Sequence, residues 1–370
     1  MRTAATELLG IDVPIFAFSH CRDVVVEVSK AGGFGCLGAG YYTKEQLKEE
    51  LKWIDDHIEG KPYGIDVLMP NKHVPLGTVK VDPATLPREQ IEFLRNLLDE
   101  AGVPPLPEGE AEEMLRKEVE KVNMTREESE ALFDVALEHP IKMVVNALGI
   151  PSKEQVERMH ARGIKVGALV GKPEHAVKQK EAGVDMVVAQ GSEAGGHTGT
   201  ISSMVLWPQI IDAIDPIPVL AAGGIGRGRQ MAAALAMGCA GVWCGSIWLG
   251  TKQSDLLPEE KARLFAGKSE DAIQSRSRTG KPARVLRSKL TEAWEQPGAP
   301  PFLPMPLQTL ATMEARLRIN RGKAKDYMSP PVGQIVANMT DEGSVKQVIF
   351  DMLNEFADCV ESLNASVEVE

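Results

Sequence analysis

Eight short apolar segments recur along the chain, and they constrain its fold more than any other feature. Each is bounded by Gly, Pro or Asp and is continuously apolar, as expected for parallel strands that are covered on both faces. We predict strands at Val13–Phe18, Gly35–Gly40, Tyr63–Met69, Met143–Leu148, Lys165–Val170, Met186–Gly191, Pro218–Gly223 and Gly241–Ser246.

Helical patterns separate these segments. Predicted helices include Lys44–Ile58, Lys153–Arg162, Pro173–Glu181, Leu206–Ile214 and Arg229–Met237. Eight strands that alternate with helices predict an α/β fold of the (β/α)8 type, a TIM barrel, and 370 residues suffice for one such domain. A doubly wound open sheet is the rival arrangement, because it uses the same alternation.

Two segments do not fit the repeating unit. Residues 71–140 form a helical insertion after the third strand, and residues 291–370 form a helical C-terminal extension. We therefore expect a barrel over residues 1–290, interrupted by the insertion, with the extension packed on it. Either segment could shape a pocket at the barrel mouth or pack at the periphery. The predicted helices of these segments are Arg88–Ala101, Glu110–Val122, Thr125–Glu138 and the amphipathic Ser344–Leu363.

The composition disfavours several classes of protein. Asp and Glu number 52 against 41 Lys and Arg, and this net charge of −11 disfavours nucleic-acid binding. The sequence contains no apolar run of membrane-spanning length and no signal-peptide core, so we expect a cytoplasmic protein with no membrane partner. Five cysteines without CxxC spacing predict neither a disulfide framework nor a metal site. An exposed terminal helix would suit a homodimer.

The charge is unevenly distributed. Residues 276–289 contain six cations and no acid, whereas residues 71–140 carry a net charge of −8. A dense basic run is either a solvated surface or a binding site for a polyanionic group such as a phosphate. The six cations are Arg276, Arg278, Lys281, Arg284, Arg287 and Lys289.

Glycine-rich sequences follow three of the predicted strands. Functional residues of a barrel lie at the carboxyl ends of its strands, and the sixth strand ends in a loop with four glycines around His197. The seventh strand ends in Gly223-Gly224 and the eighth in Gly245-Ser246. Two adjacent glycine-ended strands that each lead into a helix predict a phosphate site. The sequence GIGRG does not match GxGxxG, so a Rossmann site is disfavoured.

Other residues at the predicted mouth suit a flat, phosphorylated cofactor. Ala17 and Phe18 could line the face of an aromatic ring, while Asp66 and Gln190 offer an acceptor and an amide. This set suits FMN better than a sugar phosphate. An imidazole such as that of His197, with an ordinary pKa of about 6.5, suits proton transfer near neutral pH. Arg22 is expected to pair with Asp23 beside it or to meet an anionic substrate, and His20 is a second candidate at the mouth.

Five segments carry a resemblance to a known family. They resemble the nitronate monooxygenases, formerly called 2-nitropropane dioxygenases, and they are MRTAATELLGIDVPI at 1–15, VAQGSEAGGHTG at 188–199, VLAAGGIG at 219–226, AGVWCGSIWLG at 240–250 and YMSPPVGQ at 327–334. That family also includes FMN-dependent enoyl-ACP reductases. The resemblance implies an FMN oxidoreductase with His197 as catalytic base. It implies FMN-phosphate contacts from Gly223, Gly224, Gly245 and Ser246, and contacts to the isoalloxazine and ribityl groups from Ala17, Phe18, Asp66, Gln190, Gly191 and Gly196.

The sequence departs from the family pattern in ways that bear on its substrate. It reads FSHCRD where many members have Pro-Met after the first strand, and Asp66 where many have Asn. With the long insertion, these features resemble a branch from actinobacterial steroid breakdown that acts on CoA thioesters of the steroid C/D-ring remnant. His20, Arg22, Arg284 and Arg287 would then contact an acyl-CoA, and NAD(P)H is a candidate electron donor or acceptor. A nitronate monooxygenase that uses oxygen and a non-redox barrel for a phosphorylated metabolite are the alternatives.

Overall fold

Eight parallel strands form a closed barrel in the computed structural model, which describes residues 1–40, 42–67, 82, 86–122 and 126–367. The strands pair in chain order, and β1 also pairs with β8. The predicted (β/α)8 barrel is confirmed, and the open sheet is excluded. The strands are β1 (Ile15–Ser19), β2 (Phe34–Gly38), β3 (Tyr63–Asp66), β4 (Met143–Asn146), β5 (Lys165–Val170), β6 (Met186–Gln190), β7 (Val219–Ala222) and β8 (Gly241–Cys244).

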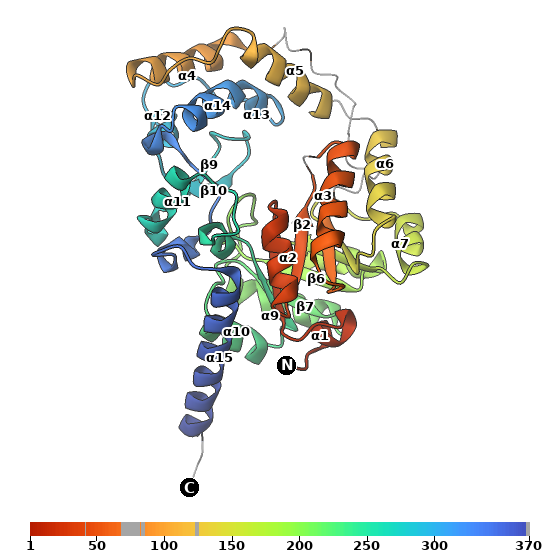
Figure 1. Cartoon of the computed structure of the whole chain (residues 1–370). Helices are drawn as coiled ribbons and strands as arrows, with labels where there is room; N and C mark the ends of the chain where they lie inside the picture. The colour runs from red at the N-terminus through yellow and green to blue at the C-terminus, as the bar shows by residue number, and fades with distance from the viewer. Residues whose placement is uncertain (41, 68–81, 83–85, 123–125, 368–370) are drawn as a thin grey trace.

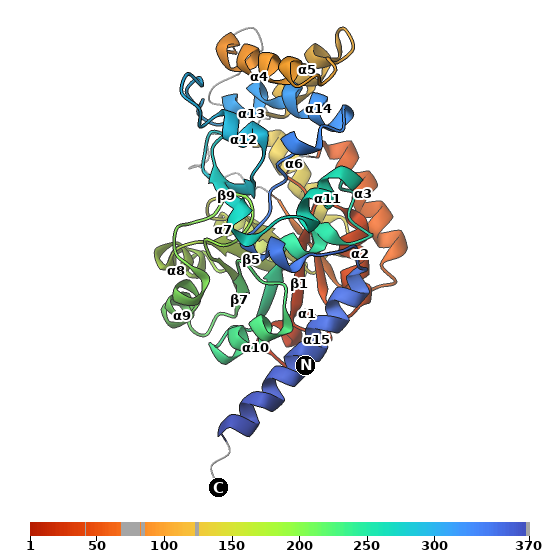
Figure 2. The same cartoon turned by 90° about the vertical axis from the view of Figure 1, so that its left-hand side faces the viewer.

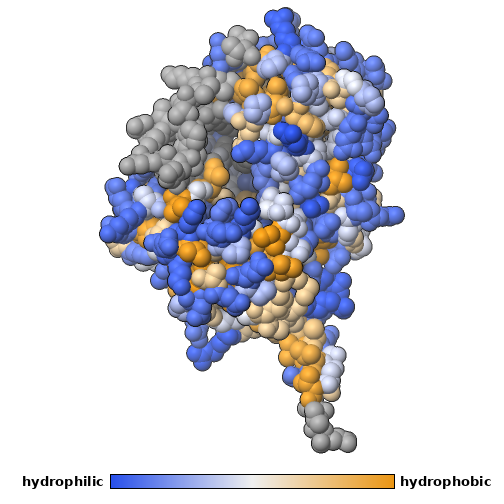
Figure 3. Space-filling model, turned by 180° about the vertical axis from the view of Figure 1, so that it is seen from behind, coloured by the Kyte–Doolittle hydropathy of each residue, from blue (hydrophilic) through white to orange (hydrophobic). Residues whose placement is uncertain are grey.

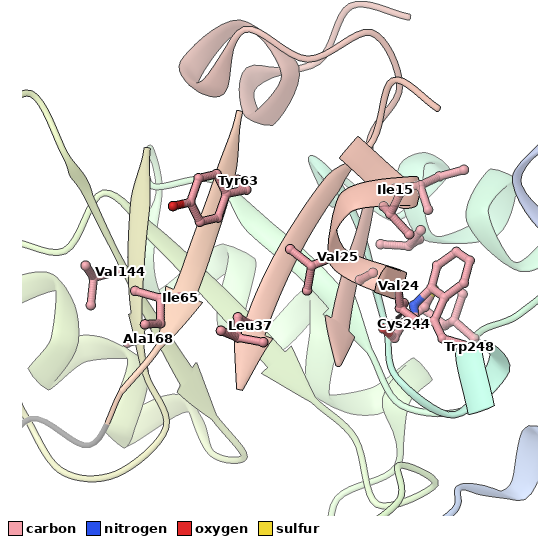
Figure 4. Packing of buried hydrophobic residues seen from close by; sticks show 14 of the residues in the cluster. Ile15, Val24, Val25, Leu37, Tyr63, Ile65, Val144, Ala168, Cys244 and Trp248 are labelled. Atoms are coloured by element: carbon pink, nitrogen blue, oxygen red, sulfur yellow. Dashed lines mark hydrogen bonds between the residues drawn. The ribbon is translucent and has the colours of Figure 1, made fainter. Parts of the chain in front are cut away.

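Alternate residues of each strand face two different cores. One set fills the inside of the barrel with large side chains such as Phe16, Met186 and Trp243. The other set, which includes Ile65 and Ala168, packs outward against the helices (Figure 4). Both sets are apolar, so each strand reads as one continuous apolar run.

A ring of eight helices surrounds the strands, and its last member comes from far along the chain. The final helix packs against the helix that follows β7 and the helix that follows β1, which places it in the eighth position of the ring (Figure 1). The predicted extension thus contributes a barrel helix. The ring consists of α2 (Arg22–Lys30), α3 (Lys44–His57), α6 (Arg126–Leu137), α7 (Lys153–His160), α8 (Pro173–Glu181), α9 (Ser203–Ile214), α10 (Gly228–Ala236) and α15 (Val345–Val367).

The rest of the insertion and extension pack on each other. Helices α4 (Arg88–Glu100) and α5 (Glu110–Val122) contact α13 (Leu307–Ala311) and α14 (Met313–Arg321) on the side of the barrel that holds the strands' carboxyl ends (Figure 2). Two apolar clusters join them, one between α4 and α14 and one between α5 and α13. The Arg318 side chain, only 3% exposed, reaches the Asp99 carboxylate at 2.6 Å. We call these four helices and the short α12 (Lys289–Ala293) the cap.

The opposite end of the barrel is closed by α1 (Ala4–Leu9), whose Ala5 and Leu9 join the interior cluster. A six-residue helix is too short for its periodicity to be recognised in the sequence. At the far end of α15, apolar side chains lie exposed along the projecting turns (Figure 3). Among the described residues, no helix combines the length and apolarity that a membrane span requires.

The basic run forms a β-hairpin. Strands β9 (Ala272–Ser275) and β10 (Ala283–Leu286) pair antiparallel, after α11 (Pro258–Phe265) and before the cap. Ala283 and Val285 are buried on β10, whereas Ala272 and Ser275, three residues apart, are buried on β9. The sequence analysis did not predict this hairpin, because two four-residue strands with so irregular an alternation give too weak a pattern.

Gly228 marks the closest approach of α10 and α15. A Cβ atom there would lie 2.0 Å from the carbonyl oxygen of Met352 and 2.4 Å from the amide nitrogen of Phe356. Gly228→Ala is therefore expected to lower the free energy of unfolding by about 1–3 kcal/mol, the usual cost of overpacking. Denaturant unfolding measures this change. Gly343→Ala is the control, since a Cβ there has nothing within 4 Å; equal stabilities of the two variants would contradict the packing.

Candidate active site at the carboxyl ends of the strands

The loop after β6, residues 191–199, carries His197 and is packed too tightly for larger residues. A Cβ atom at Gly191 would lie 2.1 Å from Ser203 Oγ, and one at Gly195 would lie 2.8 Å from the carbonyl carbon of Val332. Gly196 has a φ of +74°, in the left-handed region that favours glycine. The glycines of this loop thus let it contact α9 on one side and the segment around residue 332 on the other.

The imidazole of His197 is exposed, and one of its nitrogens has a defined partner. Its Nδ1 lies 3.1 Å from the carbonyl oxygen of Pro282. A carbonyl oxygen can only accept a hydrogen bond, so Nδ1 carries the proton in this contact. In the neutral ring, Nε2 then holds the lone pair and can accept a proton. This is the tautomer that a general base at Nε2 requires.

The glycine turns after β7 and β8 offer unused backbone donors. Gly223 and Gly224 have φ of +110° and +66°, and both turns are only half-buried. In the part of the chain that the structure describes, no hydrogen bond uses the amide N–H of Gly224, Gly245 or Ser246. Converging free amides of this kind suit an anion such as a phosphate.

The amides of Gly226, Arg227 and Gly228, just before and at the start of α10, are already occupied. Gly226 N–H donates to Gln230 Oε1 at 2.9 Å, and Gly228 N–H donates to the Glu355 carboxylate of α15 at 2.8 Å. Burial raises the pKa of Glu355, but hydrogen bonds from Arg227 and Arg229 outweigh burial and lower it to about 2. The glycine turns, rather than the start of α10 itself, are therefore available to an anion.

The rings of Phe16, Trp243 and Phe18 form an aromatic column that runs from the barrel interior up to its mouth. The Trp243 ring lies 6.3 Å from both Phe16 and Phe18, and the Phe18 ring meets the edge of His20 at 5.1 Å. His20 Nδ1 is 2.7 Å from the carbonyl oxygen of Gly38. Ala17 belongs to the outer cluster, so its side chain points away from this column and only its backbone faces the mouth.

Asp66 and Gln190 end β3 and β6 at the same rim. The Asp66 side chain is 9% exposed, and among the described residues no hydrogen bond to its carboxyl group is found. Burial raises its pKa from 3.8 to about 7. A buried carboxyl group that makes no hydrogen bond to the described residues suits a polar ligand in the mouth. With the free amides and the aromatic column, it fits the phosphate, the polar groups and the flat ring of FMN.

The candidate substrate residues lie in different surroundings. Arg22 does not form the expected pair with Asp23: its guanidinium lies 3.2 Å from Glu50 and 4.4 Å from the Trp53 ring centre, between α2 and α3. Arg284 donates from Nε and Nη2 to the carbonyl oxygen of Ser192, at 3.1 and 2.9 Å. Arg287 is 42% exposed, with its Nε 3.8 Å from Asp271.

Sequence reasoning missed three residues that hold the site together. The Glu193 carboxylate accepts hydrogen bonds from the amide and hydroxyl of Ser203, at 3.0 and 2.8 Å, at the start of α9. Gly333 N–H donates to Ser246 Oγ at 2.8 Å, so the segment YMSPPVGQ reaches the turn after β8. Pro282 supports His197. No group of His, Cys, Asp and Glu that could hold a metal occurs in the described portion of the chain.

A closed parallel barrel whose rim offers free amides, an aromatic column and a histidine has the features of an FMN-dependent oxidoreductase. The model of the family described as nitronate monooxygenase matches residues 2–355. The chain therefore belongs to the nitronate monooxygenase family, and it is an FMN-dependent oxidoreductase of that family. The resemblance found in the sequence is confirmed, and the non-redox alternative is not supported.

Relatives match most or all of the chain. The Mycobacterium tuberculosis protein Rv1533, named as a monooxygenase, is 44% identical over the whole of both chains. A Staphylococcus saprophyticus protein named as a nitronate monooxygenase is 31% identical over 78% of this chain and 79% of its own. Among solved structures, a nitroalkane oxidase from Streptomyces ansochromogenes has a TM-score of 0.77 at 27% identity, covering 98% of this chain and all of its own. FabK from Thermotoga maritima has a TM-score of 0.74 at 26% identity, covering 99% and 100%.

The raised pKa of Asp66 predicts a pH-dependent stability. The folded chain holds this proton more tightly than the unfolded chain, so stability is lost as the pH rises from about 4 to about 7. Asp66→Asn removes that loss. Its gain in unfolding free energy over the parent is expected to be larger at pH 8 than at pH 5, by roughly 2–3 kcal/mol. Thermal unfolding of FMN-free protein at both pH values measures it. The exposed Asp12→Asn is the control, and an equal gain at both pH values would contradict the argument.

Proposed function

We propose that the protein oxidises or reduces a carbon atom beside an electron-withdrawing group, with His197 as the acid or base at that carbon. The contact of His197 Nδ1 with the Pro282 carbonyl carries this proposal, because it leaves Nε2 as the proton acceptor. General acid–base catalysis by a positioned imidazole contributes about 10²–10⁴-fold in rate. The Pro282 oxygen also stabilises the imidazolium that forms when Nε2 takes up a proton. Both ring nitrogens of the imidazolium carry protons, so Nδ1 still donates to this oxygen.

The proposed cofactor site follows the rim of the barrel. The turns Gly223-Gly224 and Gly245-Ser246 would hold the FMN phosphate through their amides. Phe18, the backbone of Ala17, and Asp66, Gln190, Gly191 and Gly196 would line the ring and ribityl chain. Bound FMN supplies two-electron redox chemistry at its N5. The aromatic column excludes water from the barrel interior beneath the site.

The proposed substrate is an acyl-CoA, in particular a CoA thioester of a steroid C/D-ring remnant. A thioester carbonyl acidifies the neighbouring C–H, as this chemistry requires. The CoA phosphates need cations near His197, and the hairpin that carries Pro282 offers Lys281 and Arg287. Both are partly or largely exposed, and in the described residues Lys281 has no acidic partner. Arg284 is engaged with the His197 loop instead. NAD(P)H is the proposed electron donor or acceptor.

A second candidate is oxidation of alkyl nitronates with oxygen. The family description and the similarity to a nitroalkane oxidase favour it. The nitro group acidifies its carbon as a thioester does, so His197 would have the same task. The two candidates differ in what lies beyond the reacting carbon, because a nitronate has no phosphates for the hairpin cations.

His197→Ala is expected to retain FMN and to lower turnover by about 10²–10⁴-fold, because the variant loses the proton acceptor but none of the proposed cofactor contacts. Flavin absorbance reports the first result, and steady-state kinetics report the second. His175→Ala, an exposed histidine of α8, is the control. Turnover that stays at the parent rate in His197→Ala would rule out the assignment.

The proposal for acyl-CoA predicts a loss of affinity that depends on the CoA phosphates. Lys281→Ala combined with Arg287→Ala is expected to raise the Kd for octanoyl-CoA about tenfold, as the loss of two partly exposed ion pairs would. The octanoyl-pantetheine thioester, which lacks the nucleotide phosphates, should bind both proteins equally. Flavin difference spectra give the Kd values, and Lys48→Ala on α3 is the control. Flavin reduced anaerobically by propane 2-nitronate, with no binding of octanoyl-CoA, would favour the second candidate.

A further inference from the structure

The loop that carries His197 is paired with a strand from much later in the chain. Gly196 N–H donates to the Arg284 carbonyl oxygen at 2.9 Å, and Arg284 N–H donates to the Gly196 carbonyl oxygen at 2.7 Å. These two bonds form an isolated antiparallel bridge, so the loop pairs at this one residue with the edge of β10 that does not face β9. The antiparallel register brings His197 alongside residues 282–283, where the Pro282 carbonyl meets Nδ1.

The side chain of Arg284 hydrogen-bonds to Ser192 at the start of the same loop. Its guanidinium donates twice to the carbonyl oxygen of Ser192 and, from Nη1, to the carbonyl oxygen of Ala272 on β9. A half-buried guanidinium is costly unless its donors are used, and burial accordingly lowers the pKa of Arg284. One side chain thus joins the loop to both strands of the hairpin.

The hairpin is itself held in place by the segment that follows the cap. Leu286 N–H donates to the Pro330 carbonyl oxygen at 3.0 Å, and Gln334 N–H donates to the Glu193 carbonyl oxygen at 2.9 Å. Residues 330–334 therefore contact the hairpin at one end and the His197 loop at the other. Arg284 therefore lies on a strand whose position is itself fixed by backbone hydrogen bonds.

We propose that Arg284 is a positioning residue for His197: its hydrogen bonds to Ser192 and Ala272, which we call the fork, hold the loop on β10, so that Nδ1 donates to Pro282 and Nε2 is left to accept a proton. This inference rests on the proposed role of His197. It assigns Arg284 to proton transfer through the imidazole and not to the binding of a substrate anion.

The physical consequence concerns the tautomer of the neutral imidazole. While the loop is fixed, the Pro282 carbonyl selects the form that carries its proton on Nδ1. If the fork is lost, the two backbone bonds at Gly196 remain, but the start of the loop is released at Ser192. The ring then populates the form protonated on Nε2 as well, and that form cannot accept a proton there. The rate falls, while contacts to the rest of the substrate persist.

The tautomer can be measured without any turnover. In FMN-loaded protein labelled with ¹⁵N-histidine, His197 is expected to show a protonated Nδ1 and an unprotonated Nε2 at a pH where the ring is neutral. Arg284→Met should give a mixture of the two forms. Arg284→Lys keeps the charge but not the fork, and it should fall between the two. A parent protein with the proton on Nε2 would overturn the proposal, whether or not either variant folds.

Kinetics provide the second readout. Arg284→Met is expected to lower kcat by roughly 10–100-fold with a smaller change in KM, as a misplaced catalytic group does, in whichever of the octanoyl-CoA and propane 2-nitronate assays gives turnover. Arg318→Met is the matched control: this arginine also donates to backbone carbonyls, but within the cap. It should lose stability and leave the His197 signals unchanged.

The outcomes separate this inference from the proposed function. If His197→Ala is inactive and Arg284→Met keeps the parent kcat and a single Nδ1–H form, the positioning role of Arg284 is wrong and the base assignment stands. If His197→Ala keeps its activity, the proposed function fails, whatever the spectra show. Altered His197 signals in Arg318→Met would show a general loosening of the fold and would also overturn the specific role of Arg284.

Discussion

The site depends on the hydrogen bonds that close the barrel between its first and last strands. β1 and β8 pair with Ile15 opposite Val242 and Ala17 opposite Cys244. Because the sheet closes with all strands parallel, every strand ends at the same rim. The glycine turns after β7 and β8 therefore lie next to each other and to the loop after β6, and the aromatic column from β1 and β8 rises between them. No single element holds the site; the closed sheet brings its parts together.

Much of this arrangement could be predicted because it is encoded locally. The strands, the glycine turns and the position of His197 follow from short stretches in which each residue type has a clear physical reason. The orientation of Ala17 could not be predicted, because both faces of a barrel strand are apolar and a continuous run does not show which residues point inward. The pairing of Arg22 with Glu50 was hidden for a similar reason, since the sequence does not show which helices become neighbours.

The contacts that hold the loop carrying His197 are the least visible in the sequence. The Pro282 oxygen that meets His197 lies 85 residues further along the chain, and Arg284 reaches Ser192 across 92. A run of arginines and lysines indicates a solvated surface or an anion site. One of these arginines, Arg284, instead donates hydrogen bonds to backbone carbonyl oxygens. The resemblance of YMSPPVGQ to the family was the one sequence signal for this region, and its physical role emerged only from its contacts with Ser246 and Glu193.

The late position of α15 and of residues 330–334 has a consequence for biosynthesis. The ribosome completes the eighth strand at Cys244, and it adds Gly333, which bonds to Ser246, only 89 residues later (333 − 244 = 89), a delay of roughly 4–18 s at ordinary elongation rates. During that interval the nascent polypeptide has its strands but lacks the helix that covers the seam between α10 and α2. A product that terminates before α15 would therefore leave the seam between α10 and α2 uncovered and open to proteases and chaperones.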